Sequence, residues 1–297
     1  MSVFKVFCVM VSYNPDIEKI CESIGSVLSN GVKLILVDNG SINASQVFGL
    51  VENHPKAVFF GLEKNEGIAA AQNIGIRAAL EEGADYIWLS DQDTIYEESF
   101  SERMLNCFSL LDESVAAIGP SFYDTNREAV QPIVNLAPFT TKKIPSPGLN
   151  HVSHMIASGM FIPAEKIKLI GLKQEDLFID WVDMEWCWRA ENIFKQKLFV
   201  TGDVSIKHTL GDLNAKFLGR KIILRSPFRH YFMVRNAIAL SIYSRSLAPF
   251  TRVELFAKAI VWVALFPLLA PSNKIHHVKS TLAGALHGLS NKLGAMR

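Results

Sequence analysis

Asp91 and Asp93, with Gln92 between them, are the pair of side chains best placed to hold a divalent metal ion. They follow the apolar run from Tyr86 to Leu89, which predicts a buried strand. Mg²⁺ and Mn²⁺ favour oxygen ligands and are commonly bound by a few carboxylates together with substrate phosphates. Two aspartates at this spacing are often only a solvated turn, but their place after a buried strand favours a metal site.

A second acidic cluster lies between Phe178 and Arg189. Its acids are crowded by tryptophans, and carboxylates that lose hydration next to apolar rings are suited to accept a proton. We interpret Asp183 as a general base, with Asp180 as the competing candidate. The alternative is an amphipathic helix whose acids face water, although its three tryptophans do not all fit on one inward stripe. The residues that we expect beside a second substrate are Asp180, Trp181, Glu185, Trp186 and Arg189.

Polar residues also follow the first two predicted strands. The first strand ends in Ser12, Tyr13 and Asn14, and the second ends in Asp38. An acceptor atom at Asp38 can take the imide N–H of a uracil or thymine ring, with a turn-forming aspartate as the alternative. Ligands bind beyond the carboxyl ends of parallel strands, so these residues and Asp91 predict one shared binding edge.

The run from Asn65 to Gly75 and the single residue His208 complete the candidates. Gly67 near a helix start can expose backbone N–H groups to an anion, and Asn65 and Asn73 are not easily explained by packing. Close helix packing is the alternative for the small residues of this run. His208 follows a predicted strand and can complete a metal shell as a neutral imidazole, although a single histidine is more often structural.

Alternating strands and helices must position these residues. We expect strands where apolar runs end in turn residues, and helices where apolar residues recur with a 3.6-residue period. The expected strands cover residues 4–11, 33–37, 58–62, 86–89, 152–163 and 198–206, and the expected helices cover 16–30, 68–80 and 180–195. Residues 120–150 are rich in Pro, Asn and Thr and predict an irregular loop. The alternation implies an α/β fold, Rossmann-like, with a mostly parallel sheet and helices on both faces.

Charge divides the chain into two parts that we expect to be separate domains, residues 1–215 and 216–297. From Lys216 to Arg297 there are 13 Lys and Arg residues against one acid, Glu254, whereas the first part carries 17 bases and 28 acids. Basic, apolar helices in the second part suit the surface of an anionic membrane. A packed helical subdomain or a homo-oligomer interface is the alternative, and the site chemistry gives nucleic-acid binding no support.

No segment of the sequence predicts membrane insertion or export. The uncharged run from Ala259 to Ala270 has 12 residues, fewer than the ~20 that a spanning helix needs. The apolar start of the chain is broken early by turn residues, and the four cysteines have neither metal-site nor disulfide spacing. We therefore expect a cytoplasmic protein with reduced thiols, associated peripherally with the inner face of the membrane.

Five motifs, in order, resemble those of the family 2 inverting glycosyltransferases, which have the GT-A fold. The motifs are Val11-Ser-Tyr-Asn-Pro15, Val37-Asp-Asn-Gly-Ser41, the run Asn65 to Gly75, Ser90-Asp-Gln-Asp93 and Asp183-Met-Glu-Trp-Cys-Trp-Arg189. The resemblance covers residues 4–212. Its Asp-Gln-Asp motif and the string from Phe178 to Cys187 are similar to those of bacterial rhamnosyltransferases that use dTDP-L-rhamnose.

The resemblance implies a role for each matching residue. Asp38 would contact the pyrimidine base, Asp91 would lie near the ribose and the metal, and Asp93 would bind Mg²⁺ or Mn²⁺ directly. His208 matches a residue that touches the metal or the diphosphate, and Asp183 matches the general base. The residues implied to bind the nucleotide-sugar donor are Ser12, Tyr13, Asn14, Asp38, Asn65, Gly67, Asn73, Asp91 and Gln92.

Many members of the family have Glu-Asp where this chain has Val182-Asp183, which keeps Asp180 as a competitor for the base. The resemblance also implies an acceptor saccharide on a polyprenyl-diphosphate lipid, used to build a surface polysaccharide such as an O-antigen. A UDP-sugar donor is the alternative within the family. A nucleotide-binding regulatory protein on the same fold would keep Asp38 without needing Asp183, and a membrane scaffold would not explain the acids at the strand ends.

Overall fold

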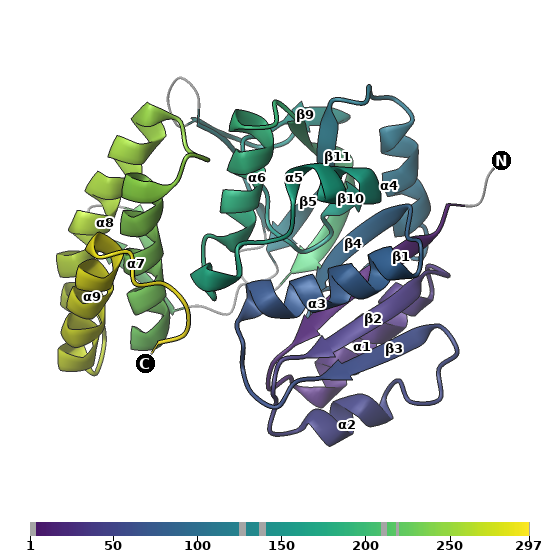
Figure 1. The fold of residues 1–297 in the computed structure, drawn as a ribbon, viewed down its shortest axis with the longest axis horizontal. Helices are drawn as coiled ribbons and strands as arrows, with labels where there is room; N and C mark the ends of the chain where they lie inside the picture. The colour runs from purple at the N-terminus through teal and green to yellow at the C-terminus, as the bar shows by residue number, and fades with distance from the viewer. Residues whose placement is uncertain (1–3, 125–128, 137–140, 209–212, 218–219, 297) are drawn as a thin grey trace.

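A computed structural model of the chain describes residues 4–124, 129–136, 141–208, 213–217 and 220–296. Within this part, a mostly parallel sheet of nine strands is flanked by helices, and three further helices stand together at one end of the molecule (Figure 1). The strand order is β3-β2-β1-β4-β10-β5-β11-β9, with β6 paired to β5. The strands are β1 (Val6–Ser12), β2 (Lys33–Asp38), β3 (Ala57–Gly61), β4 (Tyr86–Asp91), β5 (Val115–Asp124), β6 (Ala129–Val130), β9 (Leu149–His151), β10 (Phe161–Pro163) and β11 (Lys197–His208).

The first four strands run parallel, as the alternation of strands and helices predicts. All of β1 is buried because its side chains alternate between two covered faces, with Val9 on one and Met10 on the other. The helices on the Val9 face are α3 (Ile68–Glu81), α5 (Ala164–Ile170) and α6 (Val182–Asn192). Those on the Met10 face are α1 (Ile17–Leu28), α2 (Ala44–Gly49) and α4 (Phe100–Phe108).

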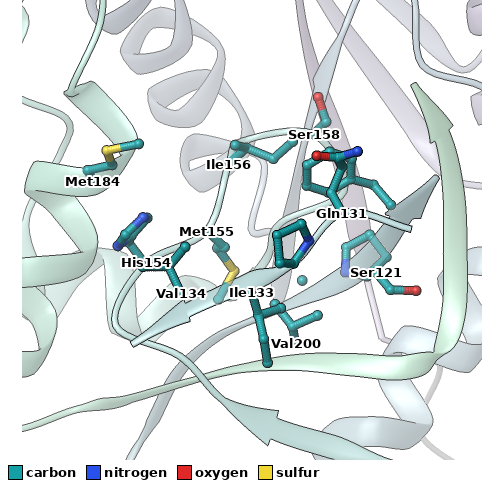
Figure 2. A pocket seen from close by; sticks show the side chains of 14 residues that line it. Ser121, Gln131, Ile133, Val134, His154, Met155, Ile156, Ser158, Met184 and Val200 are labelled. Atoms are coloured by element: carbon teal, nitrogen blue, oxygen red, sulfur yellow. The ribbon is translucent and has the colours of Figure 1, made fainter. Parts of the chain in front are cut away.

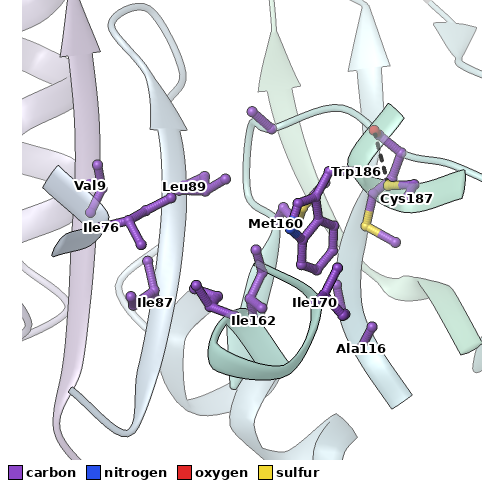
Figure 3. Packing of buried hydrophobic residues seen from close by; sticks show 14 of the residues in the cluster. Val9, Ile76, Ile87, Leu89, Ala116, Met160, Ile162, Ile170, Trp186 and Cys187 are labelled. Carbon is purple, nitrogen blue, oxygen red and sulfur yellow. Dashed lines mark hydrogen bonds between the residues drawn. The ribbon is translucent and has the colours of Figure 1, made fainter. Parts of the chain in front are cut away.

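One continuous core joins the two ends of the sheet on the Val9 face. Figure 3 shows Val9, Ile76 and Leu89 on one side of this core and Ile170 and Trp186 on the other. The core therefore fixes α6 to the same sheet that carries β1 and β4. Helices on both faces leave the strand ends as the open edge for ligands.

The stretch predicted as an irregular loop over residues 120–150 contains ordered strands. It begins within β5, ends within β9, and includes a hairpin of β7 (Ile133–Asn135) and β8 (Thr141–Lys143). The prediction of a loop throughout is therefore wrong. Short strands interrupted by Pro and Gly do not give the period-2 pattern on which a sequence-based assignment depends.

The strand predicted over residues 152–163 is confirmed only at its end, as β10, and the prediction is wrong for residues 152–160. Gly159 has a φ of +80°, and a Cβ at this position would lie 2.6 Å from Pro120. This left-handed residue interrupts the extended backbone. The apolar residues of the loop are buried against the sheet, which is why they resemble a strand in the sequence.

The C-terminal part begins with a hairpin of β12 (Leu213–Phe217) and β13 (Arg220–Leu224), where we expected only helices. A domain boundary between residues 215 and 216 falls inside β12. The expected helical region follows as α7 (Pro227–Tyr243), α8 (Pro249–Leu269) and α9 (Lys274–Leu289). These three helices pack on one another beside α6 (Figure 1).

Helix α6 is covered on two sides, so its tryptophans can be buried on different faces of the helix. Trp186 packs into the core of the sheet, whereas Trp188 and Val182 pack with α7 and α8. Trp181 stacks on Trp262 of α8 at a centroid distance of 6.0 Å. The aromatic side chains therefore do not need to share one inward stripe.

Helices α8 and α9 expose apolar side chains at helical spacing. Val253 and Leu286 are 69% and 66% exposed. The exposed apolar residues of these helices are Phe250, Val253, Ile260, Val261, Leu268, Ile275, Val278, Leu282, Leu286 and Leu289. Within the described part of the chain, none of the helices combines the length and apolarity that a bilayer crossing requires. The exposed side of α8 and α9 is therefore an apolar face.

Candidate active site

The carboxyl ends of β1, β2 and β4 lie side by side and form one side of the candidate site. We call this side the strand-end wall, and it comprises residues 12–14, 38–41 and 91–93. The register of the sheet pairs Ser12 with Asp38 and Val11 with Asp91. The structure thus brings together the polar clusters that follow three predicted strands.

Asp38 is fully buried and accepts three hydrogen bonds. Ser12 Oγ donates at 2.9 Å, and Ser41 donates through its Oγ at 2.6 Å and its backbone N–H at 2.8 Å. These bonds hold the turn after β2 against the end of β1. The carboxylate therefore organises the strand-end wall, and its contact with a pyrimidine base stays a prediction.

Tyr13 and Asn14 connect the strand ends to one another. The backbone N–H of Tyr13 donates to Gln92 Oε1 at 2.7 Å, and that of Asn14 donates to Ser41 Oγ at 2.8 Å. Asn14 Oδ1 accepts in turn from the backbone N–H of Ile42 at 2.9 Å. The turns after β1, β2 and β4 are therefore one hydrogen-bonded unit.

The loop before α3 closes the strand-end wall beside β2. Asn65 Oδ1 accepts from Asn39 Nδ2 at 3.1 Å and from the backbone N–H of Gly67 at 2.9 Å. Gly67 has a φ of +90°, and a Cβ there would lie 2.6 Å from the carbonyl oxygen of Phe178. Close approach of two backbones thus requires glycine at this position, which agrees with the packing alternative for this run.

Asp91 ends β4 and Asp93 lies two residues later, and both side chains are partly exposed. Asp91 accepts a short hydrogen bond from Ser158 Oγ. Two carboxylates are a hard oxygen donor set that fits Mg²⁺ or Mn²⁺ when phosphate oxygens supply further ligands. Among the described residues, no group of three or more His, Cys, Asp and Glu side chains is arranged to hold a metal ion by itself. The side chain of His208 lies outside the described part, so its place in a metal shell stays a prediction.

A second part of the site, which we call the loop wall, consists of residues 154–158 and Asp183 at the start of α6. Asp183 Oδ2 accepts a hydrogen bond from the backbone N–H of Ala157 at 3.1 Å. The next residue, Ser158, is the one that donates to Asp91. One short segment therefore contacts two candidate carboxylates at once. The Asp183 side chain remains 26% exposed, so a substrate group can still reach it.

Lys173 is the residue of the site that the sequence analysis missed. Its ammonium lies 3.0 Å from Asp183 Oδ1 and 5.1 Å from the ring centroid of Trp186, and its side chain is 1% exposed. Asn73 fixes the backbone of Lys173 by donating to its carbonyl and accepting from its N–H, both at 2.9 Å. A single lysine carries no sequence signal, because only the fold brings it to the acid that compensates its buried charge.

Asp180 and Trp181 hold the start of α6 to α7. Arg229 donates two hydrogen bonds to the Asp180 carboxylate, one from Nε at 3.1 Å and a shorter one from Nη2. Trp181 Nε1 donates to the carbonyl of Met233 at 3.1 Å. Since a guanidinium engages both oxygens of Asp180, this geometry favours Asp183 over Asp180 as the proton acceptor.

Three further residues that we expected beside a second substrate face the protein interior. Trp186 Nε1 donates to the carbonyl of Gly171 at 2.8 Å. Arg189 donates to the carbonyls of Ile170 and Leu172 and forms an ion pair with Glu185 at 3.0 Å. The three side chains, Glu185, Trp186 and Arg189, therefore hold α6 in place, and their contact with a second substrate stays a prediction.

Comparison with known proteins identifies the family of this fold. Residues 7–168 match the model described as glycosyl transferase family 2. The chain is 30% identical to the dTDP-rhamnosyl transferase RfbF of Shigella flexneri, with 98% of each chain covered. It is 24% identical to the low-salt glycan biosynthesis hexosyltransferase Agl10 of Haloferax volcanii, with 96% of this chain and 91% of that protein covered.

A solved structure agrees with the architecture. Residues 1–349 of S. aureus TarS superpose with a TM-score of 0.60 at 14% identity, and the match covers 96% of this chain and 81% of that chain. This likeness confirms the predicted GT-A fold with its C-terminal helical region. Because the family model spans more than half of the chain and one relative aligns over nearly all of it, the chain belongs to glycosyl transferase family 2.

Proposed function

We propose that this glycosyltransferase moves L-rhamnose from dTDP-L-rhamnose to a hydroxyl of a lipid-linked saccharide, with inversion at the anomeric carbon. The dTDP-rhamnosyl transferase of S. flexneri, which aligns over 98% of the chain, supports the choice of sugar. The observation that carries the chemistry is that Ala157 and Ser158 contact Asp183 and Asp91 from one short segment. This contact brings a carboxylate suited to take a proton close to one suited to the donor diphosphate.

The strand-end wall binds the donor in this proposal. Asp91 and Asp93 would hold Mg²⁺ or Mn²⁺, whose charge, when bound, stabilises the leaving nucleoside diphosphate. The hydrogen-bonded turns around Tyr13 and Asn14 provide a fixed edge for the nucleotide. Fixed polar groups at the leaving group act without reorganising during the reaction.

Asp183 acts as the general base. It accepts the proton of the acceptor hydroxyl while the oxygen of that hydroxyl bonds to the anomeric carbon of the donor. The bond from this carbon to the diphosphate oxygen breaks, and its electron pair stays on the diphosphate. Attack from the face opposite the leaving group inverts the configuration, and no covalent link between sugar and protein forms. Lys173 and the N–H of Ala157 hold the Asp183 carboxylate in position.

A thermal-shift screen tests the donor. At equal concentration, a ligand that binds the folded protein more tightly raises Tm more. We therefore expect dTDP-L-rhamnose with Mn²⁺ to stabilise the protein more than UDP-glucose, UDP-GlcNAc, UDP-galactose or GDP-mannose. A UDP-sugar is the competing donor, because thymine and uracil share the imide N–H assigned to Asp38. Greater stabilisation by a UDP-sugar would contradict dTDP-L-rhamnose as the donor but not the proposed transfer reaction. Binding with neither hydrolysis nor transfer would support a non-catalytic regulatory protein.

We also propose that the apolar face of α8 and α9 binds the cytoplasmic surface of an anionic membrane, where the polyprenyl-diphosphate acceptor resides. Apolar side chains such as Ile260 and Leu286 are exposed there beside the exposed lysines Lys258, Lys274 and Lys279. This combination suits insertion into the head-group region of acidic lipids. The excess of basic over acidic residues from position 216 onwards gives the C-terminal part the complementary charge.

Flotation with phosphatidylserine vesicles tests this membrane face. The wild type should float, and a variant with both Ile260→Asp and Leu286→Asp should stay at the bottom of the gradient. Ile42→Asp is the matched control, because Ile42 is 95% exposed in the turn after β2. Unchanged flotation of the double variant contradicts the proposal. Conversion of a dimer to a monomer without loss of flotation would assign the face to a homo-oligomer interface.

A further inference from the structure

A cavity of about 180 Å³ opens beside the loop wall, between β5, β11 and the hairpin that begins at β7. Figure 2 shows His154 and Ser121 on opposite sides of the cavity, with Met155 and Ile133 between them. A cavity of ~150 Å³ accommodates a benzene molecule. The space beside the loop wall therefore suits one six-membered ring.

The walls of this cavity are mainly apolar with a few polar atoms. Ile133, Met155 and Val200 are buried side chains that line it. Ser121 already donates to the carbonyl of Val204 at 3.0 Å. An apolar wall favours a ligand with a C–H face or a methyl group over one with hydroxyls on every side.

His154 lines the cavity and carries a buried polar atom. Its Nδ1 is buried and has no hydrogen-bond partner among the described residues. Burial is the main cause that lowers the pKa of His154 to about 4, so the ring is neutral at pH 7. A buried polar atom without a partner is unfavourable, and a ligand hydroxyl in the cavity would satisfy it.

Residues that line the cavity are neighbours of both candidate carboxylates. Ser158 lines it and donates to Asp91, and Ala157, between the lining residues Ile156 and Ser158, donates to Asp183. Met184, the neighbour of Asp183 in the chain, lines the cavity as well. A ring bound in this cavity would therefore lie next to the group that takes the proton.

We propose that this cavity is the subsite for the acceptor sugar and that it selects a pyranose with an apolar face, such as a deoxyhexose. The inference rests on the proposed transferase activity and adds the substrate class of its acceptor side. His154 contacts a ring hydroxyl, and Ile133, Met155 and Val200 contact the apolar face.

The test fills the cavity and measures acceptor and donor use separately. Val134→Trp places a large ring in the cavity, and Val58→Trp is the control, because Val58 is similarly half-buried in β3 at the far edge of the sheet. Two rates are measured with dTDP-L-rhamnose: transfer to octyl α-L-rhamnopyranoside, and donor hydrolysis by water without acceptor. We expect Val134→Trp to lower the ratio of transfer to hydrolysis at least tenfold, and Val58→Trp to change it less than twofold.

A second variant removes only the polar atom. His154→Leu should raise the KM for octyl α-L-rhamnopyranoside about tenfold with little change in the donor KM, and octyl β-D-glucopyranoside should be a poorer acceptor of the wild type. Equal ratios of transfer to hydrolysis in the wild type and Val134→Trp, or a preference for the glucoside, would overturn the subsite. Absence of both hydrolysis and transfer in the wild type would instead overturn the proposed function.

Discussion

Asp38 of the strand-end wall and Asp183 of the loop wall are carboxylates with different surroundings. On the strand-end wall, Asp38 is 0% exposed and accepts hydrogen bonds from two hydroxyls and one backbone amide. On the loop wall, Asp183 is 26% exposed and is held by one amide and the ammonium of Lys173. The carboxylate is therefore enclosed at Asp38 and accessible at Asp183.

This difference separates an organising role from a reactive one. A fully bonded, buried carboxylate holds neighbouring turns together, and removing it should mainly lower stability. A carboxylate that is positioned but still exposed can exchange a proton with a substrate, and removing it should mainly lower the rate. The predictions below test whether the two walls differ in this way.

Asp183→Asn should have the largest effect on activity. We expect it to lower kcat for transfer at least ~10²-fold, because the amide cannot take the proton, while the donor affinity stays unchanged. Steady-state kinetics and donor titration measure the two quantities. Asp180→Asn serves as the control, because asparagine has nearly the same shape as the aspartate that contacts Arg229. It should lower kcat far less. Near-normal transfer by Asp183→Asn would show that Asp183 is not the general base.

Asp93→Ala should weaken donor binding by about tenfold or more when Mn²⁺ is present, since a ligand of the metal is lost. Calorimetric titration with dTDP-L-rhamnose, with and without Mn²⁺, measures this effect. The wild type without metal should bind as weakly as the variant. Full transfer by the wild type in excess chelator would contradict the metal role of the strand-end wall.

Lys173→Met should lower kcat about tenfold, because it leaves Asp183 without the cation that positions it. The KM for the donor should not change, and Lys173→Arg should restore part of kcat because it keeps a positive charge near Trp186. A purely structural role would instead lower Tm in both variants and leave kcat of the folded fraction intact.

Asp38→Ala should destabilise the protein by ~2–3 kcal/mol, because three donors in a buried site lose their acceptor. Asp16→Ala is the matched control: the Asp16 side chain accepts two backbone N–H bonds at the start of α1 on the surface, and its loss should cost only ~1 kcal/mol. Urea unfolding compares the two variants. Equal destabilisation would show that the strand-end wall does not depend on Asp38.

The smallest effect concerns pH. Burial, with smaller contributions from Lys142 and Lys258, lowers the pKa of His154 to about 4 in the folded protein, against ~6.5 when unfolded. The unfolded protein binds a proton at His154 more readily than the folded protein does. The free energy of unfolding is therefore unaffected by this group above pH ~6.5 and declines as the pH falls towards 4. Between pH 7 and 5, urea midpoints of His154→Leu should fall less than those of the wild type. If the urea midpoints of the two proteins fall equally between pH 7 and 5, the lowered pKa of His154 is contradicted.

The sequence predicted the strand-end wall well because its signals are local. Buried apolar runs ending in turn residues located β1 to β4 within two residues of their observed ends, and the polar residues after them follow directly along the chain. The loop wall was not predictable in this way. Lys173 and Asp183 meet only through the fold. Glu185 is buried and accepts a hydrogen bond from Ser246, between α7 and α8, which the sequence alone does not indicate.

The configuration of the product at its anomeric carbon tests the central claim most directly. If Asp183 deprotonates the acceptor for a single displacement, NMR of the purified product should show the configuration opposite to that of the donor sugar at every time point. Retention of the donor configuration in the first-formed product would require a second displacement and would contradict the account.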